Sequence, residues 1–577
     1  MNNHTIKTVY FRYNYSITSI NQIKGEGIMK TKVLLFAMVW AAMHLSLMKA
    51  GAQEVNDLNA KRWSMPVSFH NQPVVMAEQE DEQPVTNESD EKKVLTVELT
   101  DGLTLANALG DDRYTVDSLI VKGFMPQSDF PVLYDLALWG RMTGLNMKHC
   151  KVEGDSIPSN AFFYNVQGNG KLYDEQTHEQ LKQNTYYCLN YIKLPEELKT
   201  IGDSAFKHSY PLTRVLHLKG ELELPEGLTD IGESAFGCHW SMSCHRMVGT
   251  LRFPSTVRRI GYGAFSGNWF NTIVLPDPDV EIGPFTFFAS HKLREVVFPE
   301  GITRLADAMF KLSNFGDKEE LVLPETIEEL GIQTFALCNL KRVVLPTHLK
   351  KIPDGCFAQV PLKEINLPEG LEEIGDEAYV VYKESYSPPY GKYQMIDEIT
   401  IPSSVHTIGR YAFYEQDFKT IHLPASLTQI GVRAFYKKDM QYNKPCEVYA
   451  YNPVPPTLIM DDEEDYDNIF RAFNENDWQD SEYLMRTLYV PEGARDAYMA
   501  DRSWNLDYFK EIVEMTQAGI VETEKDCMAD GEADIFDMNG RLIGKTMVNG
   551  QSIDTTELQR GIYIVRKGNA SKKIVVK

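Results

Sequence analysis

Histidine, cysteine and carboxylate side chains could carry catalysis or bind a metal, but their spacing in this chain matches no common site. The thirteen histidines are dispersed, and there is no G-x-S-x-G nucleophile elbow, HExxH zinc motif, P-loop or glycine-rich dinucleotide pattern. We therefore expect no enzyme, no catalytic residue, no metal and no cofactor. Eight histidines occupy variable positions of a repeat, which favours surface or loop placement: His208, His217, His239, His245, His291, His348, His406 and His422.

The eight cysteines are scattered, without a CxxC pair or a metal-knuckle spacing. Cys238 and Cys244 could bridge a short loop in an oxidising compartment, but two unrelated thiols are the favoured interpretation. Cys356 occupies the small-residue position of an IPDGCF motif. We expect it to be a buried substitute for alanine rather than a reactive thiol.

The densest run of carboxylates lies within the segment from Asp461 to Tyr483, which begins DDEEDYD. These side chains could hold calcium, but the ordered EF-hand spacing with its glycine is missing. A solvated acidic loop is favoured, and calcium remains the alternative.

Length and composition exclude several classes of protein. The chain has 577 residues, of which 43% are hydrophobic, with a net charge of −23. It is too apolar to be disordered throughout and too polar to be embedded in a membrane. The acidic balance and the lack of a basic stripe argue against nucleic-acid binding.

A repeat of about 22 residues fills the centre of the chain. Each unit has a short aliphatic run ending in proline, followed by Ile-Gly-x-x-Ala-Phe or a close variant. The prolines are Pro195, Pro225, Pro254, Pro276, Pro299, Pro324, Pro346, Pro368, Pro402 and Pro424. The aromatic closures follow in phase: Phe206, Phe236, Phe265, Phe287, Phe310, Phe335, Phe357, Tyr379, Phe413 and Phe435.

A unit this small cannot bury its own apolar face, so the units must stack and share a core. In LKRVVLP, the spacing turns Leu340, Val343 and Leu345 inward along a short strand and leaves Arg342 and Val344 outside. Proline then ends the strand because it has no N–H for the ladder. We assign the glycine of Ile-Gly to a turn, and the small alanine lets phenylalanine pack on the neighbouring coil.

This register predicts two columns of outward residues. Two residues before each proline stand Lys193, Glu223, Arg252, Val274, Val297, Val322, Val344, Asn366, Thr400 and His422. Four residues before each proline stand Tyr191, Glu221, Thr250, Thr272, Glu295, Glu320, Arg342, Glu364, Glu398 and Thr420. The sheet face would carry an aliphatic stripe beside mostly acidic neighbours. Such an exposed apolar patch often marks a binding site, although valine also simply suits a strand.

We hypothesise that this face binds a macromolecule together with a tyrosine-rich insertion, Tyr382 to Tyr393. The predicted partner-binding residues are Val274, Val297, Val322, Val344, Glu295, Glu320, Arg342, Tyr386 and Tyr390.

The LP-x-x-L-x-x-IG-x-x-AF unit resembles the BspA-type leucine-rich repeat of surface proteins from Gram-negative anaerobes, over residues 156–440. The resemblance implies a leucine-rich-repeat solenoid that is β-rich and similar to an α/β horseshoe. Residues 95–155 are similar to the N-terminal cap of such arrays. Residues 441–516 resemble the terminal repeat, with the acidic insertion and a short capping helix in GARDAYMADRSW.

An export signal begins at Met29 rather than at Met1. Two lysines precede an apolar run from Val33 to Leu47, and small residues follow before Gln53, so residues 29–52 read as a signal peptide. The run is shorter than a bilayer span, so we expect no transmembrane segment in the mature chain. Residues 1–28 read as a wrongly extended start, and 53–94 as a disordered acidic linker.

Residues 521–577 contain short strands separated by Asn-Gly and Arg-Gly turns, which predicts a small C-terminal antiparallel β domain. The segment resembles the Por-type (type IX) C-terminal sorting domain in three stretches: Asp537 to Arg541, Leu558 to Tyr563, and Lys572 to Lys577. In that family the domain directs passage across the outer membrane. A simple β cap that is no signal remains the alternative.

These resemblances imply a protein secreted to the outer surface of a Gram-negative bacterium. Its role would be an adhesin or binding scaffold for host matrix or plasma proteins, or for other bacteria. The alternative is a surface glycan- or nutrient-binding module that uses aromatic side chains as stacking platforms. The candidate platforms are Trp240, Trp269, Tyr386, Tyr390 and Trp478.

Overall fold

The computed structural model describes most of the chain from residue 92 onward. The described ranges are 92–162, 188–207, 217–238, 245–316, 320–382, 396–416, 418–436, 446–460, 486–504, 509–515, 531–536, 542–549, 552–553, 555, 558, 561–567 and 570–576. Several predictions fall outside these ranges: the signal peptide, almost all of the linker, the insertion beyond Tyr382, and the acidic run from Asp461.

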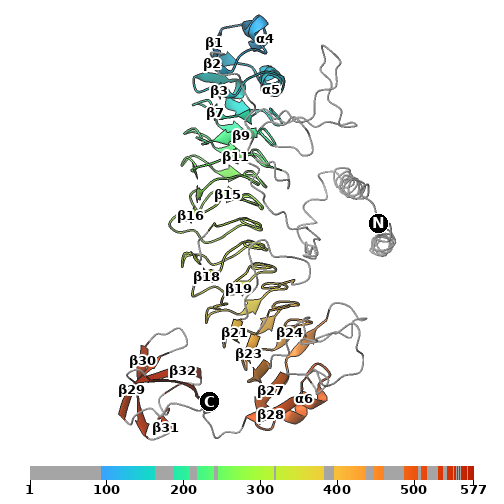
Figure 1. Ribbon diagram of the computed structural model, residues 1–577, viewed down its shortest axis with the longest axis vertical. Coiled ribbons are helices and arrows are strands. Elements are labelled where there is room, and N and C mark those ends of the chain that lie inside the picture. The colour runs from blue at the N-terminus through green and yellow to red at the C-terminus, as the bar shows by residue number, and fades with distance from the viewer. Residues whose placement is uncertain are drawn as a thin grey trace, which may run out of the picture. The chain divides into compact units, whose positions relative to one another are not determined.

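The described part of the chain begins with strands and short helices that precede the regular repeats (Figure 1). Their bounds are β1 (Val94–Leu99), α4 (Leu105–Leu109), η1 (Gly110–Asp112), β2 (Ser118–Met125), η2 (Gln127–Asp129), α5 (Phe130–Trp139), β3 (Gly144–Asn146), β4 (Cys150–Val152) and η3 (Glu153–Asp155). Strands β1, β2 and β3 pair in parallel, and β3 pairs with the first repeat strand, β7 (Tyr191–Lys193). This segment therefore continues the parallel ladder of the repeats.

Eight of the ten proline repeats contribute a first strand that ends one to three residues before the proline, and these strands stack in parallel (Figure 1). After β7 they are β12 (Thr250–Leu251), β14 (Thr272–Val274), β16 (Glu295–Val297), β17 (Glu320–Val322), β18 (Arg342–Val344), β21 (Ile396–Thr400) and β23 (Phe418–Leu423). The series ends in β25 (Cys446–Ala450), β27 (Arg486–Pro491) and β28 (Glu511–Met515). Three further strands pair beside the early repeats: β6 (Cys188–Leu189), β9 (His217–Gly220) and β11 (Arg246–Met247).

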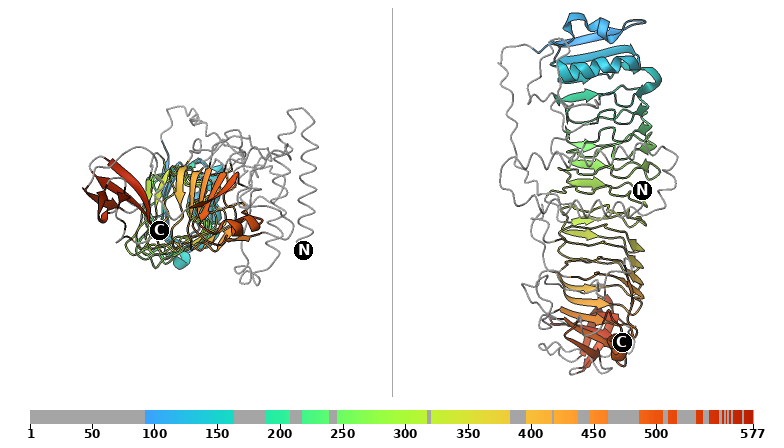
Figure 2. Two further views of the ribbon diagram at one scale, coloured as in Figure 1. Left: turned by 90° about the horizontal axis from the view of Figure 1, so that it is seen from below. Right: turned by 90° about the vertical axis from the view of Figure 1, so that its right-hand side faces the viewer.

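A second series of shorter strands lies at the Ile-Gly corner of the coils. These are β5 (Ser156–Ile157), β8 (Thr200–Ile201), β10 (Asp230–Ile231), β13 (Arg259–Ile260), β15 (Glu281–Ile282), β19 (Lys351–Ile352), β20 (Glu373–Ile374), β22 (Thr407–Ile408), β24 (Gln429–Gly431) and β26 (Thr457–Ile459). They pair in the orders β15-β13-β10-β8-β5 and β19-β20-β22-β24-β26. The view in Figure 2 shows the strands as successive rungs. The predicted strand-rich solenoid is thus confirmed as a parallel β-solenoid.

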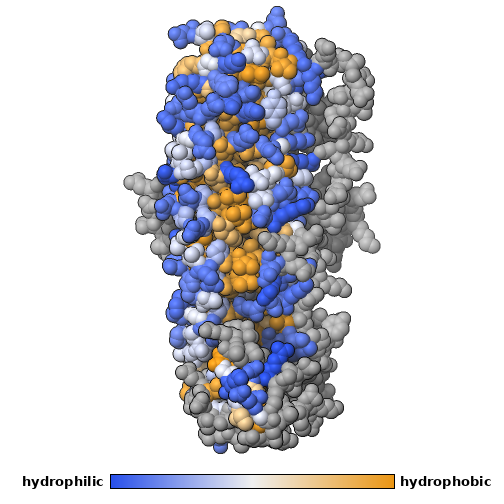
Figure 3. Space-filling view, turned by 90° about the vertical axis from the view of Figure 1, so that its left-hand side faces the viewer, coloured by the Kyte–Doolittle hydropathy of each residue, from blue (hydrophilic) through white to orange (hydrophobic). Residues whose placement is uncertain are grey.

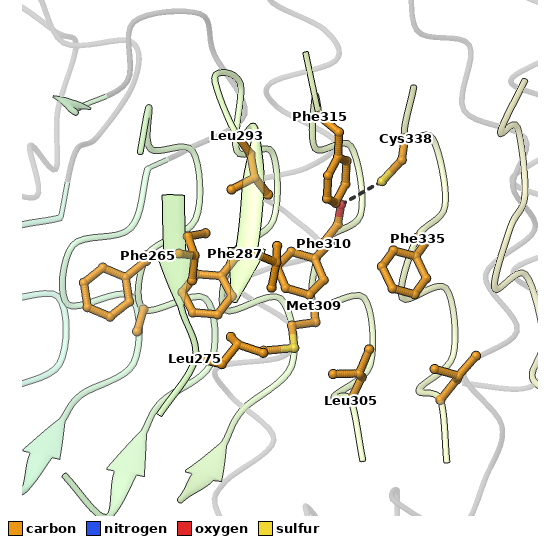
Figure 4. Packing of buried hydrophobic residues seen from close by; sticks show 14 of the residues in the cluster. Phe265, Leu275, Phe287, Leu293, Leu305, Met309, Phe310, Phe315, Phe335 and Cys338 are labelled. Carbon is orange, nitrogen blue, oxygen red and sulfur yellow. Dashed lines mark hydrogen bonds between the residues drawn. The ribbon is translucent and has the colours of Figure 1, made fainter. Parts of the chain in front are cut away.

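Aromatic rings form a continuous stack through the core (Figure 4). Phe206 and Phe236 lie 5.0 Å apart between ring centroids at an interplanar angle of 6°, and Phe310 and Phe335 lie 5.9 Å apart at 9°. The stack continues from Phe162 to Phe435 through every closure of the repeat. Each closure from Phe162 to Phe413 also hydrogen-bonds to the next coil: the Phe206 N–H, for example, donates to the Ala235 carbonyl at 2.8 Å. The packing of each aromatic closure on the neighbouring coil is therefore as the sequence predicted.

The glycine of Ile-Gly has a different role from the one predicted. Gly232 does not have a positive φ, but a Cβ atom there would lie 2.5 Å from the backbone nitrogen of Asp203 in the preceding coil. The same backbone clash, at 2.2–2.7 Å, holds for Gly202, Gly261, Gly283, Gly331, Gly375, Gly409 and Gly431. In these eight coils the residue is glycine because adjacent coils are in backbone contact, not because the chain turns there.

The left-handed turn lies two residues after this position, which is glycine in eight of the ten repeats and is Ala306 or Pro353 in the other two. In ten repeats that residue has φ between 49° and 61°: Ser204, Ser234, Gly263, Phe285, Ala308, Gln333, Gly355, Glu377, Tyr411 and Arg433. Eight of these ten are neither glycine nor asparagine nor aspartate, the types that enter this region most easily. Hydrogen bonds between coils hold the residues in place: the Ser204 N–H donates to the Glu233 carbonyl at 2.8 Å.

The ends of the chain also match the expected elements. The predicted capping helix is α6 (Arg495–Ala500), which buries Tyr498 against Trp504 at 5.5 Å between rings. The tail forms a separate antiparallel sheet of β29 (Gly531–Phe536), β30 (Leu542–Asn549), β31 (Ser552–Ile553), β32 (Gly561–Lys567) and β33 (Ala570–Val576). Its own small core contains Ala533, Ile535, Val548, Ile553, Val565 and Ile574.

We predict that Gly232→Ala lowers the free energy of unfolding by about 2 kcal/mol or more, because the added methyl group forces two coils apart. Chemical denaturation of the mature protein measures the change. The control is Gly370→Ala, whose Cβ would lie 3.3 Å from its nearest neighbour, the Thr347 carbonyl oxygen. Equal losses in the two variants would contradict a steric role for the glycine column.

Candidate binding face of the solenoid

The first strands present alternate side chains to the outside, and four valines occupy one line. Val274 pairs in register with Val297, and Val322 with Val344. Val297 is 40% exposed and Val322 is 58% exposed, whereas the other two are half-buried. Figure 3 shows an apolar band between polar margins on one side of the molecule. We call these four residues the valine stripe.

Carboxylates occupy the parallel line two residues earlier in the strands. We define the acidic column as Glu295, Glu320, Glu364, Glu398, Glu447 and Glu511. Arg342 is the basic residue in this line; it bonds to Glu320 at 2.8 Å and to Glu364 at 2.5 Å. All three side chains are more than 40% exposed, so these ion pairs orient the groups more than they stabilise the fold. The structure thus brings Glu295, Glu320 and Arg342 onto the same face as the valines.

The face continues into the last repeats as a ladder of stacked rings. His422, Tyr449 and Tyr489 pair in register along β23, β25 and β27. The ring centroids of His422 and Tyr449 lie 4.8 Å apart, and those of Tyr449 and Tyr489 lie 4.5 Å apart, with the rings nearly parallel in each case. The Tyr449 hydroxyl donates to Glu447 at 3.0 Å. Burial and this carboxylate raise the pKa of Tyr449.

Sequence reasoning missed Tyr449 and Tyr489. Tyr489 lies two residues before Pro491 in LYVPEG, so the proline rule applied one strand further would have found it. Tyr449 lies four residues before Pro453, where the proline marker has shifted by two positions. Register pairing with Tyr489, rather than proline spacing, places it in the column.

Two histidines that were predicted to lie on the surface are buried. His422 is only 7% exposed because rings from the next strand cover it, and its ring nitrogens contact the Tyr451 hydroxyl at 2.9 Å and Glu398 at 3.2 Å. His245 is fully buried, and its Nδ1 accepts from the Leu218 N–H at 3.0 Å. Its Nε2 lies 2.6 Å from the Phe206 carbonyl oxygen. The two ring nitrogens thus contact backbone groups of two different coils. A buried histidine is favourable here because its polar atoms have partners.

Three of the described cysteines are buried free thiols: Cys150, Cys338 and Cys356. Cys356 is fully buried and has no disulfide, as predicted, and burial raises the pKa of its thiol. Burial raises the pKa of Cys150 to about 12. The preference for an unpaired thiol at Cys238 was wrong, because Cys238 is disulfide-bonded. The other thiol of this pair is not among the four free cysteines Cys150, Cys338, Cys356 and Cys446.

Metal and membrane sites can be judged only within the described ranges. There, no group of three or more histidine, cysteine, aspartate or glutamate side chains could hold a metal ion. Among the same residues, no helix combines the length and the apolar character that crossing a bilayer requires. Tyr386, Tyr390, Trp240 and Trp478 lie outside the described residues. Trp269 is half-buried, with Arg246 and Lys292 at 5.0 and 5.5 Å from its ring centroid.

The described chain therefore belongs to the parallel β-solenoids, with one outward sheet face that carries an aliphatic line beside a carboxylate line. The family is also clear: the BspA type leucine rich repeat region model matches residues 155–246, 219–317, 314–387 and 390–444. The secretion system C-terminal sorting domain model matches residues 517–577. The protein is a BspA-type leucine-rich-repeat protein with a sorting-domain tail, and this combination indicates an exported protein.

Three solved structures are similar to parts of this chain. A leucine-rich repeat protein from Bacteroides ovatus is 20% identical over 64% of this chain and 92% of that chain, with a TM-score of 0.35. A leucine rich cell surface protein from Faecalibacterium prausnitzii is 15% identical over 59% and 79%, with a TM-score of 0.28. The pneumococcal vaccine antigen PcpA is 17% identical over 60% and 82%, with a TM-score of 0.27. Values this low carry no functional inference, and no curated protein matches the chain significantly.

Lys311 provides a test of the packing beside the core. Its ammonium group donates to Gln333 at 2.7 Å, and burial lowers its pKa from 10.5 to about 8. Between these two pH values the unfolded chain binds more protons than the folded chain, so stability rises with pH there. We predict that Lys311→Met raises the melting temperature near neutral pH, and that this gain disappears as the pH approaches 10.5.

Melting curves across this pH range measure the effect. The matched control is Lys350→Met, which removes a positive charge from an exposed side chain paired with Glu372. A gain for Lys311→Met that is the same at all pH values would contradict a burial cost of the charge.

Proposed function

We propose that this exported protein is a cell-surface adhesin or binding scaffold, and that the valine stripe and the acidic column bind an extracellular protein. The surface would be the outer surface of a Gram-negative bacterium. Its partner would be a host matrix or plasma protein, or a protein of another bacterium. The proposal treats the chain as a binding protein rather than an enzyme. The sorting-domain tail supports export of the chain.

The observation that carries the proposal is the exposure of two large aliphatic side chains on one regular face. Val297 and Val322 are 40% and 58% exposed, and they do not contribute to the core, which is built by the inward residues of the same strands. Aliphatic side chains in line on an exposed sheet favour binding of another apolar surface. Charged neighbours around such a patch provide specificity and steer association.

The glycan-binding alternative draws less support from the described residues. A sugar stacks on the open face of an aromatic ring, whereas the rings of Tyr449 and Tyr489 stack on each other at 4.5 Å. The Trp269 ring has two cationic side chains within 5.5 Å of its centroid. The insertion tyrosines Tyr386 and Tyr390 keep this alternative open, because they lie outside the described residues.

We predict that Val297→Glu combined with Val322→Glu abolishes partner binding and leaves the fold intact, because both side chains point away from the core. The mature protein would be used in pull-downs against a panel of extracellular-matrix proteins, plasma proteins and polysaccharides. Circular dichroism and the melting temperature report the fold.

The matched control is Ile332→Glu, since Ile332 is 43% exposed but lies in the LGIQTF corner rather than on the sheet face. If the double variant binds its partner as tightly as the wild-type protein does, the valine stripe is not the binding site. Retention of polysaccharides alone would favour the glycan-binding alternative.

A further inference from the structure

The two lines of the binding face have a fixed geometry that restricts what can lie on it. Neighbouring strands are about 4.8 Å apart, so each line offers one side chain about every 4.8 Å. The lines are two residues apart along each strand, which corresponds to about 6.6 Å. A partner segment that crosses the strands therefore meets two parallel rows of side chains.

The two rows differ in chemistry in several coils. The apolar row begins with the valine stripe and resumes after Asn366, Thr400 and His422 with Tyr449, Tyr489 and Val513. The other row contains the six glutamates of the acidic column and one base, Arg342. In the last five strands of this face, which are β21, β23, β25, β27 and β28, the two rows contain three glutamates and no lysine or arginine. The face is complementary to an apolar row beside a basic row.

An α-helix fits this requirement better than an extended strand does. A helix presents neighbouring lines of side chains on one face, whereas a strand points successive side chains to opposite faces and offers one line. The pitch of a helix is about 5.4 Å, close to the spacing of the strands. The mismatch is about 0.6 Å per turn, so three or four turns keep in step before the offset reaches half a strand spacing.

We propose that the partner segment bound by this face is a basic amphipathic α-helix of about three to four turns that lies across the strands. Its apolar line contacts the valine stripe or the tyrosine ladder, and its lysine and arginine line contacts the acidic column. This inference rests on the proposed function, because it names the partner of the same face. The net charge of −23 steers such a segment toward the protein.

Several of the carboxylates are available for a new ion pair. Glu295, Glu447 and Glu511 form no ion pair with the described residues, and Glu295 is exposed. The contacts around the other two come from neutral hydroxyls: Tyr449 donates to Glu447, and Thr487 donates to Glu511 at 3.4 Å. A cationic side chain can therefore join these groups without displacing an existing charge partner.

The test uses two synthetic peptides of 14 residues with the same leucine and lysine composition. In the first, leucine and lysine form two adjacent lines on a helix; in the second, the order is scrambled so that no line forms. Fluorescence anisotropy measures binding to the mature protein, and circular dichroism measures helix content. We expect the patterned peptide to bind at least about tenfold more tightly than the scrambled one and to gain helicity.

Two double variants test whether the acidic column takes part in the contact. Glu295→Gln with Glu447→Gln is expected to weaken binding of the patterned peptide about threefold to tenfold and to reduce its salt dependence. The control, Glu281→Gln with Glu328→Gln, removes two exposed carboxylates at the Ile-Gly corner and should leave binding unchanged. Equal binding of the two peptides, or equal effects of the two variants, would overturn the helix proposal.

Failure of this inference can be separated from failure of the proposed function. If Val297→Glu with Val322→Glu prevents capture of a panel protein while neither peptide binds the wild-type protein, the face is a protein-binding surface whose partner is not a basic helix.

Discussion

Backbone contact between adjacent coils at the glycine column sets the spacing on which the other features of this protein depend. A single Cβ atom at Gly431 would lie 2.2 Å from the backbone nitrogen of Arg410. Coils this close together can pair through backbone hydrogen bonds between their first strands and between their corner strands, with the strands parallel. They also place each aromatic closure on the next, within 6.2 Å between ring centroids. Fixed spacing converts a sequence repeat into straight columns of side chains.

The outward columns follow from the same constraint. Inward residues of each first strand, such as Val343 and Leu345, build one continuous core, so the residues between them must face outward. Each column therefore consists of the side chains that occupy the same repeat position in successive coils. Valine and glutamate recur at two such positions, and the result is a striped face rather than a pocket. An extended surface of this kind suits binding of a macromolecule more than enclosure of a small substrate.

Much of this arrangement could be predicted from sequence because the proline and phenylalanine markers keep a constant phase. The phase predicted the strand alternation, the ring stack and the residues of the valine stripe. The role of the glycine could not be predicted in this way, because conformational freedom and steric exclusion select the same residue type. The left-handed residues were also hidden, since Phe285, Tyr411 and Arg433 share no chemical property that marks a turn.

The candidate site was predicted in part for a related reason. A column is readable from sequence only while its marker holds, and the shift of the proline to Pro453 concealed Tyr449. Burial of His422 and His245 depends on neighbours from other coils, at Tyr449 and Tyr451 for the first and at Phe206 and Leu218 for the second. Repeat position alone does not specify those contacts. The residue type at each repeat position determines the chemistry of a column. Contacts with neighbouring coils determine how deeply each of its side chains is buried.

Site-specific photocross-linking tests the central claim, that the outward sheet face binds the partner, most directly. Benzoylphenylalanine would replace Val322 on the sheet face and, in a separate variant, Ile332 at the corner; both side chains are exposed. After incubation with a protein captured from the panel, the account predicts a covalent product from position 322 and none from position 332. Cross-linking from position 332 alone would contradict it.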